Sequence, residues 1–377
     1  MNRRAISLMV VPALLSVLTA CGATDSKTAG TTATPAASTT PAAAEDANKT
    51  LTLDQITEKA KQEGKVVSVG MPDTWANWKD TWNELSTKYG IQHTDTDMSS
   101  AEEIAKFEAE KDKPTADIGD VGMAFTSVAV EKGVVQPYKP STWDKIPEWA
   151  KDKDGNWVVG YQGTIAIMTN TKLVKNPPKS FDDILKGDYK VAIGDVAKAS
   201  QAQTAILAAA MAFGGDEKNI QPGIDFFEKL SKQKRISLSE VKVANFEKGE
   251  VEVALVWDFN ALGYKDQLKS NDYDILIPKE ASVIGGYATI INKYAPHPNA
   301  AKLTREYILS DAGQINLAKG FARPIRDDVK LPDDVASKMI PIDQYKNARP
   351  IKDFKAWDTT SKAIPQMWEE KVLVNLN

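Results

Sequence analysis

The sequence predicts an α/β protein made of two α/β units, joined by strands that cross from one unit to the other. Helix-like and strand-like segments alternate over roughly the first 90 folded residues, then break near residues 151–170 and resume. Hydrophobic residues make up 42% of the 377 residues and charged residues 26%, which is an ordinary globular composition. The chain is long enough to bury a sizeable core.

The first 50 residues have the pattern of a secretion signal followed by a tether. A basic start precedes a mostly apolar run, residues 6–20, that is too short to remain as a membrane span. The run ends in the letters LTAC, which resemble a bacterial lipobox, and Cys21 is the only cysteine. We expect a signal peptide over 1–20, and over 21–50 a lipidated Cys21 with a disordered tether, because the tract lacks residues that could form a core. The alternative is a plain signal peptide with an incidental cysteine.

The first unit is predicted from capped helices that alternate with apolar strands. Thr52, with Gln55 three residues later, is expected to cap a helix that Gly64 closes. Aromatic residues at helical spacing mark the next helix. This alternation indicates a mainly parallel sheet covered by helices. The expected helices are 53–63, 75–90, 99–113 and 124–133, and the expected strands are 65–71, 91–97 and 115–122.

A turn interrupts this order before the second unit. Asp154-Gly155 is a hairpin signal, and two strand-like runs, 156–163 and 164–170, follow it. Strands near 161–170 and 284–292 are the expected crossings between the units. The later helices are expected at 180–187, 200–215, 223–233, 245–250, 260–270, 298–320 (as a pair) and 364–373, and the later strands at 190–195, 251–258, 273–278 and 285–292.

Several segments together resemble the bacterial extracellular solute-binding proteins. Residues 295–329 are similar to the C-terminal signature of that family, and residues 160–174 and 180–195 resemble its central segments. The similarity covers 51–377 and lies in the order of the segments. It implies a periplasmic-binding-protein-like fold whose two lobes close on one solute. The family serves ABC importers for polyamines, iron, thiamine and phosphonates.

The resemblance also gives expected limits for the parts of the chain. Lobe 1 is expected over 51–165 plus 285–350, lobe 2 over 166–284, and a C-terminal helical tail over 351–377. A lipid anchor fits the same interpretation, because a cell without a periplasm must hold its receptor beside the permease.

Composition and missing motifs argue against several other functions. The net charge is −4 and the charges are mixed, which does not favour nucleic acid binding. A calcium-loop-like start near Asp95 fails, because Ser100 and Lys106 stand where glycine and glutamate are needed. The chain has no phosphate-binding loop and no nucleophile elbow, and it has only two histidines. The tyrosine pair of many iron-binding relatives is also missing. We expect no enzyme activity, no cofactor and no metal.

Ligands of open α/β sheets bind beyond the carboxyl ends of the strands, and this rule selects the candidate site residues. Three serines at predicted helix starts could meet an anion, or they could only cap the helices. An aromatic face beside a carboxylate at the end of a strand suits an amine, or it marks a half-buried strand end. The candidates are Asp73, Trp75, Ser99, Ser100, Gly122, Ser200, Trp257, Asp258 and Tyr287.

These inferences combine into one expected function. The protein is expected to be the lipid-anchored substrate-binding component of an ABC importer on the outer face of the cell membrane. It would capture a small polar organic solute by lobe closure, with an aminophosphonate-like zwitterion or an organic anion favoured. A polyamine or ferric ion is the alternative ligand, and a cell-surface phosphoester hydrolase is the alternative class. We expect a monomer that meets permease subunits and touches the membrane only through its anchor.

Overall fold

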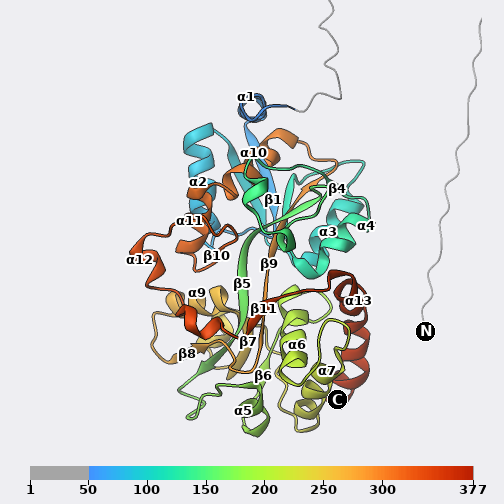
Figure 1. Ribbon diagram of the computed structural model, residues 1–377, viewed down its shortest axis with the longest axis vertical. Helices are drawn as coiled ribbons and strands as arrows, with labels where there is room; N and C mark the ends of the chain where they lie inside the picture. Colours follow the sequence, from blue (N-terminus) through green and yellow to red (C-terminus); the bar gives the residue numbers. More distant parts are fainter. Residues whose placement is uncertain (1–50, 377) are drawn as a thin grey trace, which may run out of the picture. The chain divides into compact units, whose positions relative to one another are not determined.

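A computed structural model of the chain describes residues 51–376, which form one compact α/β unit (Figure 1). Its sheet runs in the order β2-β1-β3-β9-β5-β7-β6. One lobe is built around β1–β3 and the other around β6 and β7, and β5 and β9 run between them (Figure 1). The predicted two-lobe α/β architecture is therefore confirmed. Cys21 and the predicted signal peptide and tether lie outside the described residues.

The first lobe has the predicted parallel strands. β1 (Lys65–Val69) pairs in parallel with both β2 (Gln92–Thr96) and β3 (Ile118–Gly122). α1 (Leu53–Glu63) begins at Thr52 with a capping box to Gln55 and ends at Gly64 in the left-handed conformation, as predicted. The other early elements are α2 (Trp78–Tyr89), α3 (Ser100–Ala109), η1 (Met123–Phe125), α4 (Thr126–Glu131), β4 (Val135–Gln136), η2 (Trp143–Lys145) and η3 (Glu148–Ala150).

Two long antiparallel strands join the lobes. β5 (Trp157–Asn170) pairs with β9 (Ser282–Asn292) through its first half. Its second half pairs with β7 (Val253–Trp257) and β8 (Tyr273–Leu276). The sequence predicted two runs here, but the strand is continuous, because its irregularity lies between Val159 and Tyr161 and does not end the pairing. β5 therefore belongs to the sheets of both lobes.

The second lobe is centred on α6 (Ser200–Ala212), almost all of whose residues are buried. Its alanines let neighbours approach closely, and Gly223 does the same for α7 (Gln221–Lys232), since a Cβ there would lie 2.3 Å from the carbonyl oxygen of Ile206. The remaining elements of this lobe are α5 (Phe181–Lys186), β6 (Val191–Ala192), α8 (Val243–Glu247) and α9 (Asp258–Leu268).

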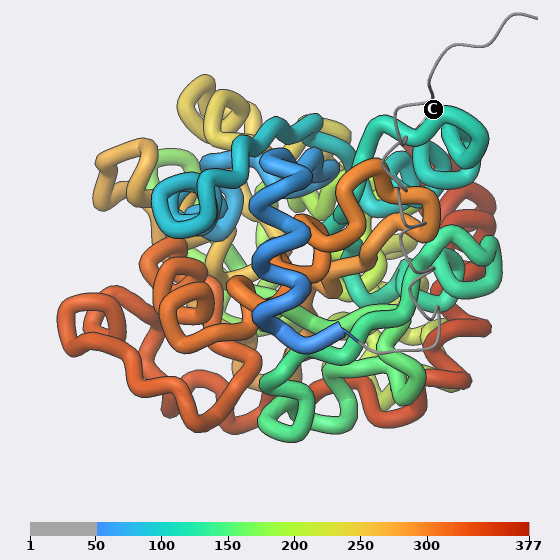
Figure 2. Tube along the Cα trace, turned by 90° about the horizontal axis from the view of Figure 1, so that it is seen from above, coloured from blue at the N-terminus to red at the C-terminus, as the bar shows by residue number. Residues whose placement is uncertain are grey.

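After β9 the chain returns to the first lobe before it crosses again. α10 (Pro298–Ile308) packs against α1, and Figure 2 shows the two helices side by side at the surface. The predicted helix pair is completed by α11 (Asp311–Lys319). The last elements are β10 (Arg323–Pro324), α12 (Asp333–Ala336), η4 (Ile342–Tyr345), β11 (Ala348–Pro350), α13 (Phe354–Lys371) and η5 (Leu373–Asn375).

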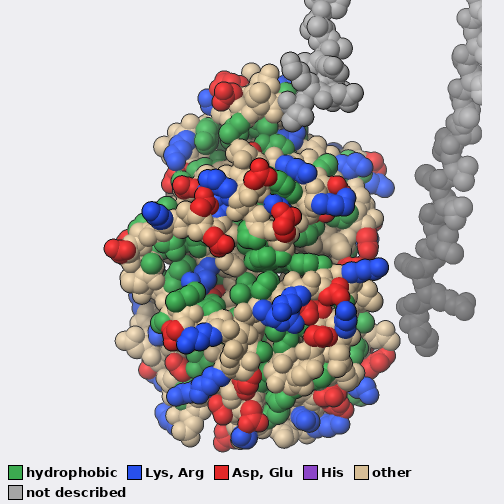
Figure 3. Space-filling model, viewed as in Figure 1, with side chains coloured by type: hydrophobic (Ala, Val, Ile, Leu, Met, Phe, Trp, Pro, Cys, Tyr) green, Lys and Arg blue, Asp and Glu red, His purple; other side chains and the backbone are tan. Residues whose placement is uncertain are grey.

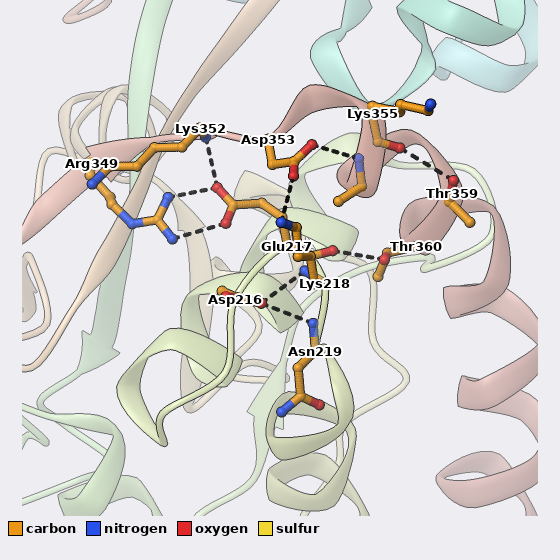
Figure 4. A network of polar contacts seen from close by, with 11 residues as sticks. Asp216, Glu217, Lys218, Asn219, Arg349, Lys352, Asp353, Lys355, Thr359 and Thr360 are labelled. Atoms are coloured by element: carbon orange, nitrogen blue, oxygen red, sulfur yellow. Dashed lines mark hydrogen bonds and ion pairs between the residues drawn. The ribbon is translucent and has the colours of Figure 1, made fainter.

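The C-terminal segment touches both lobes. Glu217, which follows α6, receives two hydrogen bonds from the Arg349 guanidinium, at 2.6 and 3.0 Å, and one from the backbone N–H of Lys352 at 2.7 Å (Figure 4). Burial alone would raise the pKa of Glu217, but these hydrogen bonds outweigh it and lower the pKa to about 2. On its other side α13 pairs Lys362 with Glu131 of α4. The residue limits predicted for the lobes stay a prediction.

Candidate ligand-binding site

A cavity of about 930 Å³ lies where the two lobes meet. The first lobe contributes the segments that follow β1 and β2, together with the body of β3, and the second lobe contributes the start of α6 and one side of α9. The volume lies in the range of small-molecule sites. The rule that ligands bind beyond the carboxyl ends of strands thus identified the edge of the sheet at which the cavity lies.

Five of the nine candidate residues line this cavity, and four do not. The five on the cavity are Asp73, Trp75, Ser99, Ser100 and Tyr287. The four that do not line it are Gly122, Ser200, Trp257 and Asp258.

The serines at the start of α3 already have hydrogen-bond partners within the protein. The Glu102 carboxylate accepts hydrogen bonds from the backbone N–H of Ser99, at 3.1 Å, and from its hydroxyl, at 2.7 Å. The Ser100 hydroxyl accepts a hydrogen bond from the backbone N–H of Gly122 at 3.0 Å. The cap interpretation of these serines therefore has direct partners, and the Glu102 carboxylate places negative charge at this helix start.

Gly122 and Ser200 form a contact between the lobes. A Cβ at Gly122 would lie 2.1 Å from Cβ of Ser200, far inside normal contact. The glycine is therefore required for this close approach between β3 and the start of α6. Ser100 and Ser200 therefore each contact Gly122, and these contacts lie within the protein.

Trp257 and Asp258 lie beside the crossing strand β5 and do not line the cavity. Oδ1 of Asp258 accepts hydrogen bonds from the backbone N–H groups of Thr164 and Phe259, each at 2.9 Å, and Oδ2 accepts one from the Tyr345 hydroxyl at 2.6 Å. Burial raises the pKa of this carboxyl. Both oxygens are thus engaged, and the expected contact with a ligand amine does not exist in this arrangement. Trp257 is fully buried, so its ring offers no face to the cavity.

Aromatic side chains form one wall of the cavity. The ring of Trp75 meets Phe259 edge to face at 5.5 Å and Tyr287 at 5.3 Å between centroids. Trp75 Nε1 donates a hydrogen bond of 2.7 Å to the Tyr161 hydroxyl, which donates one of 2.6 Å to Oδ2 of Asp120. The interpretation of Trp75 as part of a helical stripe is wrong, because α2 begins only at Trp78.

Sequence reasoning missed Asp120 and Glu103, two buried carboxylates on the cavity. Each is only 1% exposed. The backbone N–H of Asp120 donates a hydrogen bond of 2.9 Å to Oε2 of Glu103. Desolvation by burial raises the pKa of both groups well above their usual range. One signal was available in the sequence: Asp120 interrupts the strand-like run IGDVG, where every other residue is apolar or glycine.

Negative charge dominates the cavity. Nine carboxylates and three lysines line it, and each lysine is paired with one of the nine: Lys198 with Glu102 at 3.3 Å, Lys242 with Glu240 at 3.0 Å and Lys319 with Asp80 at 3.7 Å. Within residues 51–376 no ion pair joins the other six to a lysine or arginine, namely Asp73, Asp97, Glu103, Asp120, Asp195 and Asp266. On the face shown in Figure 3, by contrast, charges of both signs are interspersed over both lobes.

The family model for bacterial extracellular solute-binding proteins matches residues 113–347, which is more than half of the chain. The chain is a bacterial extracellular solute-binding protein. The solute-binding protein is also 26% identical over 320 residues to an uncharacterised protein of Haemophilus influenzae, covering 78% of this chain and 86% of that protein. The predicted family is thereby confirmed, and the family consists of binding proteins.

Solved structures of periplasmic binding proteins share the fold. The solute-binding protein resembles AfuA of Actinobacillus pleuropneumoniae, solved with fructose-6-phosphate, with a TM-score of 0.69 and 20% identity over 82% of this chain and 98% of AfuA. It also resembles the spermidine/putrescine-binding protein PotD of Streptococcus pneumoniae, with a TM-score of 0.60 and 16% identity over 82% of this chain and 99% of PotD. These likenesses show the two-lobe fold alone.

Within residues 51–376 no helix is long and apolar enough to cross a membrane. No group of three or more His, Cys, Asp or Glu side chains there is arranged to hold a metal ion.

Proposed function

We propose that this solute-binding protein is the lipid-anchored receptor of an ABC importer, and that its solute carries a cationic group. The single observation that carries the second part is the charge of the cavity, in which six carboxylates remain without a lysine or arginine partner among the described residues. Glu103 and Asp120 are buried, where a carboxylate without a cation is costly. The other four are exposed and add negative charge at the cavity, so a cationic solute complements this wall.

This charge shifts the ligand preference that the sequence suggested. The sequence favours an aminophosphonate-like zwitterion or an organic anion, with the anionic group at serines of helix starts. The Glu102 carboxylate lies at one of those starts, and Ser200 does not line the cavity. The structural relatives do not decide between ligand classes. They include a protein with bound fructose-6-phosphate and binding proteins or receptors for ferric ion, thiamin, GABA and spermidine/putrescine. An amine-bearing solute fits both the carboxylates and the aromatic wall.

Capture is proposed to work by closure of the lobes. The cavity is lined from both lobes, and the lobes touch at Gly122 and Ser200. A solute that contacts both lobes favours the closed state by its differential contacts, and β5 and β9 supply the hinge. The lipid anchor at Cys21 remains part of the proposal on the basis of its sequence pattern.

A thermal-shift screen tests the ligand class. Amines, zwitterions and organic anions should be compared at equal concentration, since a ligand at 100 times its dissociation constant adds about 2.7 kcal/mol of stability. We expect the stabilising compounds to carry an amine. Stabilisation by anions only would contradict a cationic solute. Turnover of generic phosphoesters that follows the folded protein would instead favour the hydrolase class.

A further inference from the structure

Asp120 and Glu103 leave one carboxylate oxygen without a partner inside the protein. Oδ2 of Asp120 is engaged by the Tyr161 hydroxyl, but Oδ1 is buried and accepts no hydrogen bond from any described residue. Asp120 is 1% exposed and lines the cavity together with Glu103. An unpaired buried carboxylate oxygen beside a ligand cavity marks a place where a donor is expected.

The backbone is shaped to hold this pair. A Cβ at Gly70 would lie 2.3 Å from Oε1 of Glu103, and a Cβ at Gly119 would lie 2.6 Å from its Oε2. Any other residue at either position would push the Glu103 carboxylate away, so Gly70, which follows β1, and Gly119 on β3 make room for it. Tyr161, itself held by Trp75, fixes the rotamer of Asp120 from the other side. The pair is therefore positioned by four residues outside it.

We propose that Asp120 and Glu103 form the subsite that receives the ammonium group of the solute. This inference rests on the proposed receptor function and names the residues that contact the charged group of the solute. A protonated amine brings several N–H donors and one positive charge to a site that has spare acceptors and no cation. Trp75 and Tyr287 line the same cavity, and an aromatic ring attracts a cation that lies over its face.

The groups around the pair disfavour its negative charge. Burial raises the pKa of both carboxyls, the charge of Asp120 raises that of Glu103 further, and Asp95 raises both. Hydrogen bonds act in the opposite direction, from the backbone of Asp120 to Glu103 and from Tyr161 to Asp120. The hydroxyls of Tyr161 and Tyr287 are the other titratable groups that face the pair, and burial raises the pKa of each. An ammonium group beside the pair would favour the ionised form of both carboxyls.

The test compares the parent protein with Asp120→Asn and with Asp343→Asn, a charge-matched control at an exposed position outside the cavity. The probes are 1,4-diaminobutane and 2-aminoethylphosphonate, each paired with an analogue that lacks the amine, 1,4-butanediol and ethylphosphonate, within a wider set of amines paired in the same way. Titration calorimetry measures affinity, and thermal unfolding measures the stability of the empty protein.

We expect Asp120→Asn to weaken an amine that binds the parent by tenfold or more, and to leave its amine-free analogue and the control variant unchanged. The same variant should raise the melting temperature of the empty protein, because it removes an unpaired buried carboxylate while Tyr161 keeps an acceptor. If Asp120 had only a structural role, Asp120→Asn would lower the melting temperature and weaken the binding of every probe equally. That result would overturn the proposal.

Other outcomes separate this subsite from the receptor function. If the parent binds only amine-free probes, the ammonium subsite is wrong and the receptor function stands. If a metal ion alone stabilises the parent but not Asp120→Asn, the subsite receives a metal cation and the ammonium proposal is overturned. If the parent binds no solute of either class in the wider screen, both proposals are contradicted.

Discussion

Adding one methyl group at Gly122 tests whether the lobes must touch there for the protein to bind its solute. The Cβ of Gly122→Ala would lie 2.1 Å from Cβ and 2.4 Å from Oγ of Ser200, whereas ordinary contacts begin at 3.4 Å. The lobes must separate locally by about 1.3 Å, the difference between these distances, to accept it. Overpacking of this kind costs about 1–3 kcal/mol. If the cost falls on the closed state, solute affinity should decrease by about 5- to 150-fold.

A second substitution identifies the clash as the cause. Ser200→Gly in the Gly122→Ala background removes both clashing atoms, and the next atom, the Ser200 Cα, lies at 3.6 Å, an ordinary contact. Ser200→Ala keeps the Cβ and should not restore affinity. Titration calorimetry with a solute from the thermal-shift screen gives the affinities, and small-angle scattering reports compaction. The reasoning is refuted if Gly122→Ala binds as tightly as the parent, or if Ser200→Ala rescues it as well as Ser200→Gly does.

Three other predictions concern the C-terminal segment, the cavity wall and the anchor. Glu217→Gln should lower the free energy of unfolding at pH 7 by about 1.5–3 kcal/mol. Because folding lowers the pKa of Glu217 from 4.5 to about 2, urea unfolding should show this difference vanishing as the pH falls through that range, and a constant difference would contradict it. Trp75→Ala should weaken amine binding by about 2- to 30-fold through the lost ring contact, with Trp75→Phe intermediate in calorimetry. Cys21→Ala should abolish labelling with a fatty-acid probe, and persistent labelling would disprove the anchor.

The sequence predicted the local elements because their causes are local. The cap at Thr52, the left-handed turn at Gly64 and the turn at Asp154-Gly155 each depend on residues within a few positions. Alternation of helix and strand predicted the parallel strands of the first lobe, and the order of family-like segments predicted two lobes with crossing strands. The short strands β4, β10 and β11 were not predicted, because two or three residues carry no periodicity and pair only with distant strands.

The candidate site has features that could not be predicted from residues close together in the sequence. The sequence by itself determined the fold class and the edge of the sheet at which the cavity forms. The reason is that alternating helices and strands imply parallel strands, whose carboxyl ends lie at one edge. It did not determine which polar groups remain free. Asp258 was a candidate but is held by Thr164 and Tyr345. Asp120 was not a candidate, but it lines the cavity and keeps a buried oxygen without a partner among the described residues. Only the tertiary structure decided this, because hydrogen bonds between residues 87 and 94 positions apart consume the acceptors that the sequence leaves open.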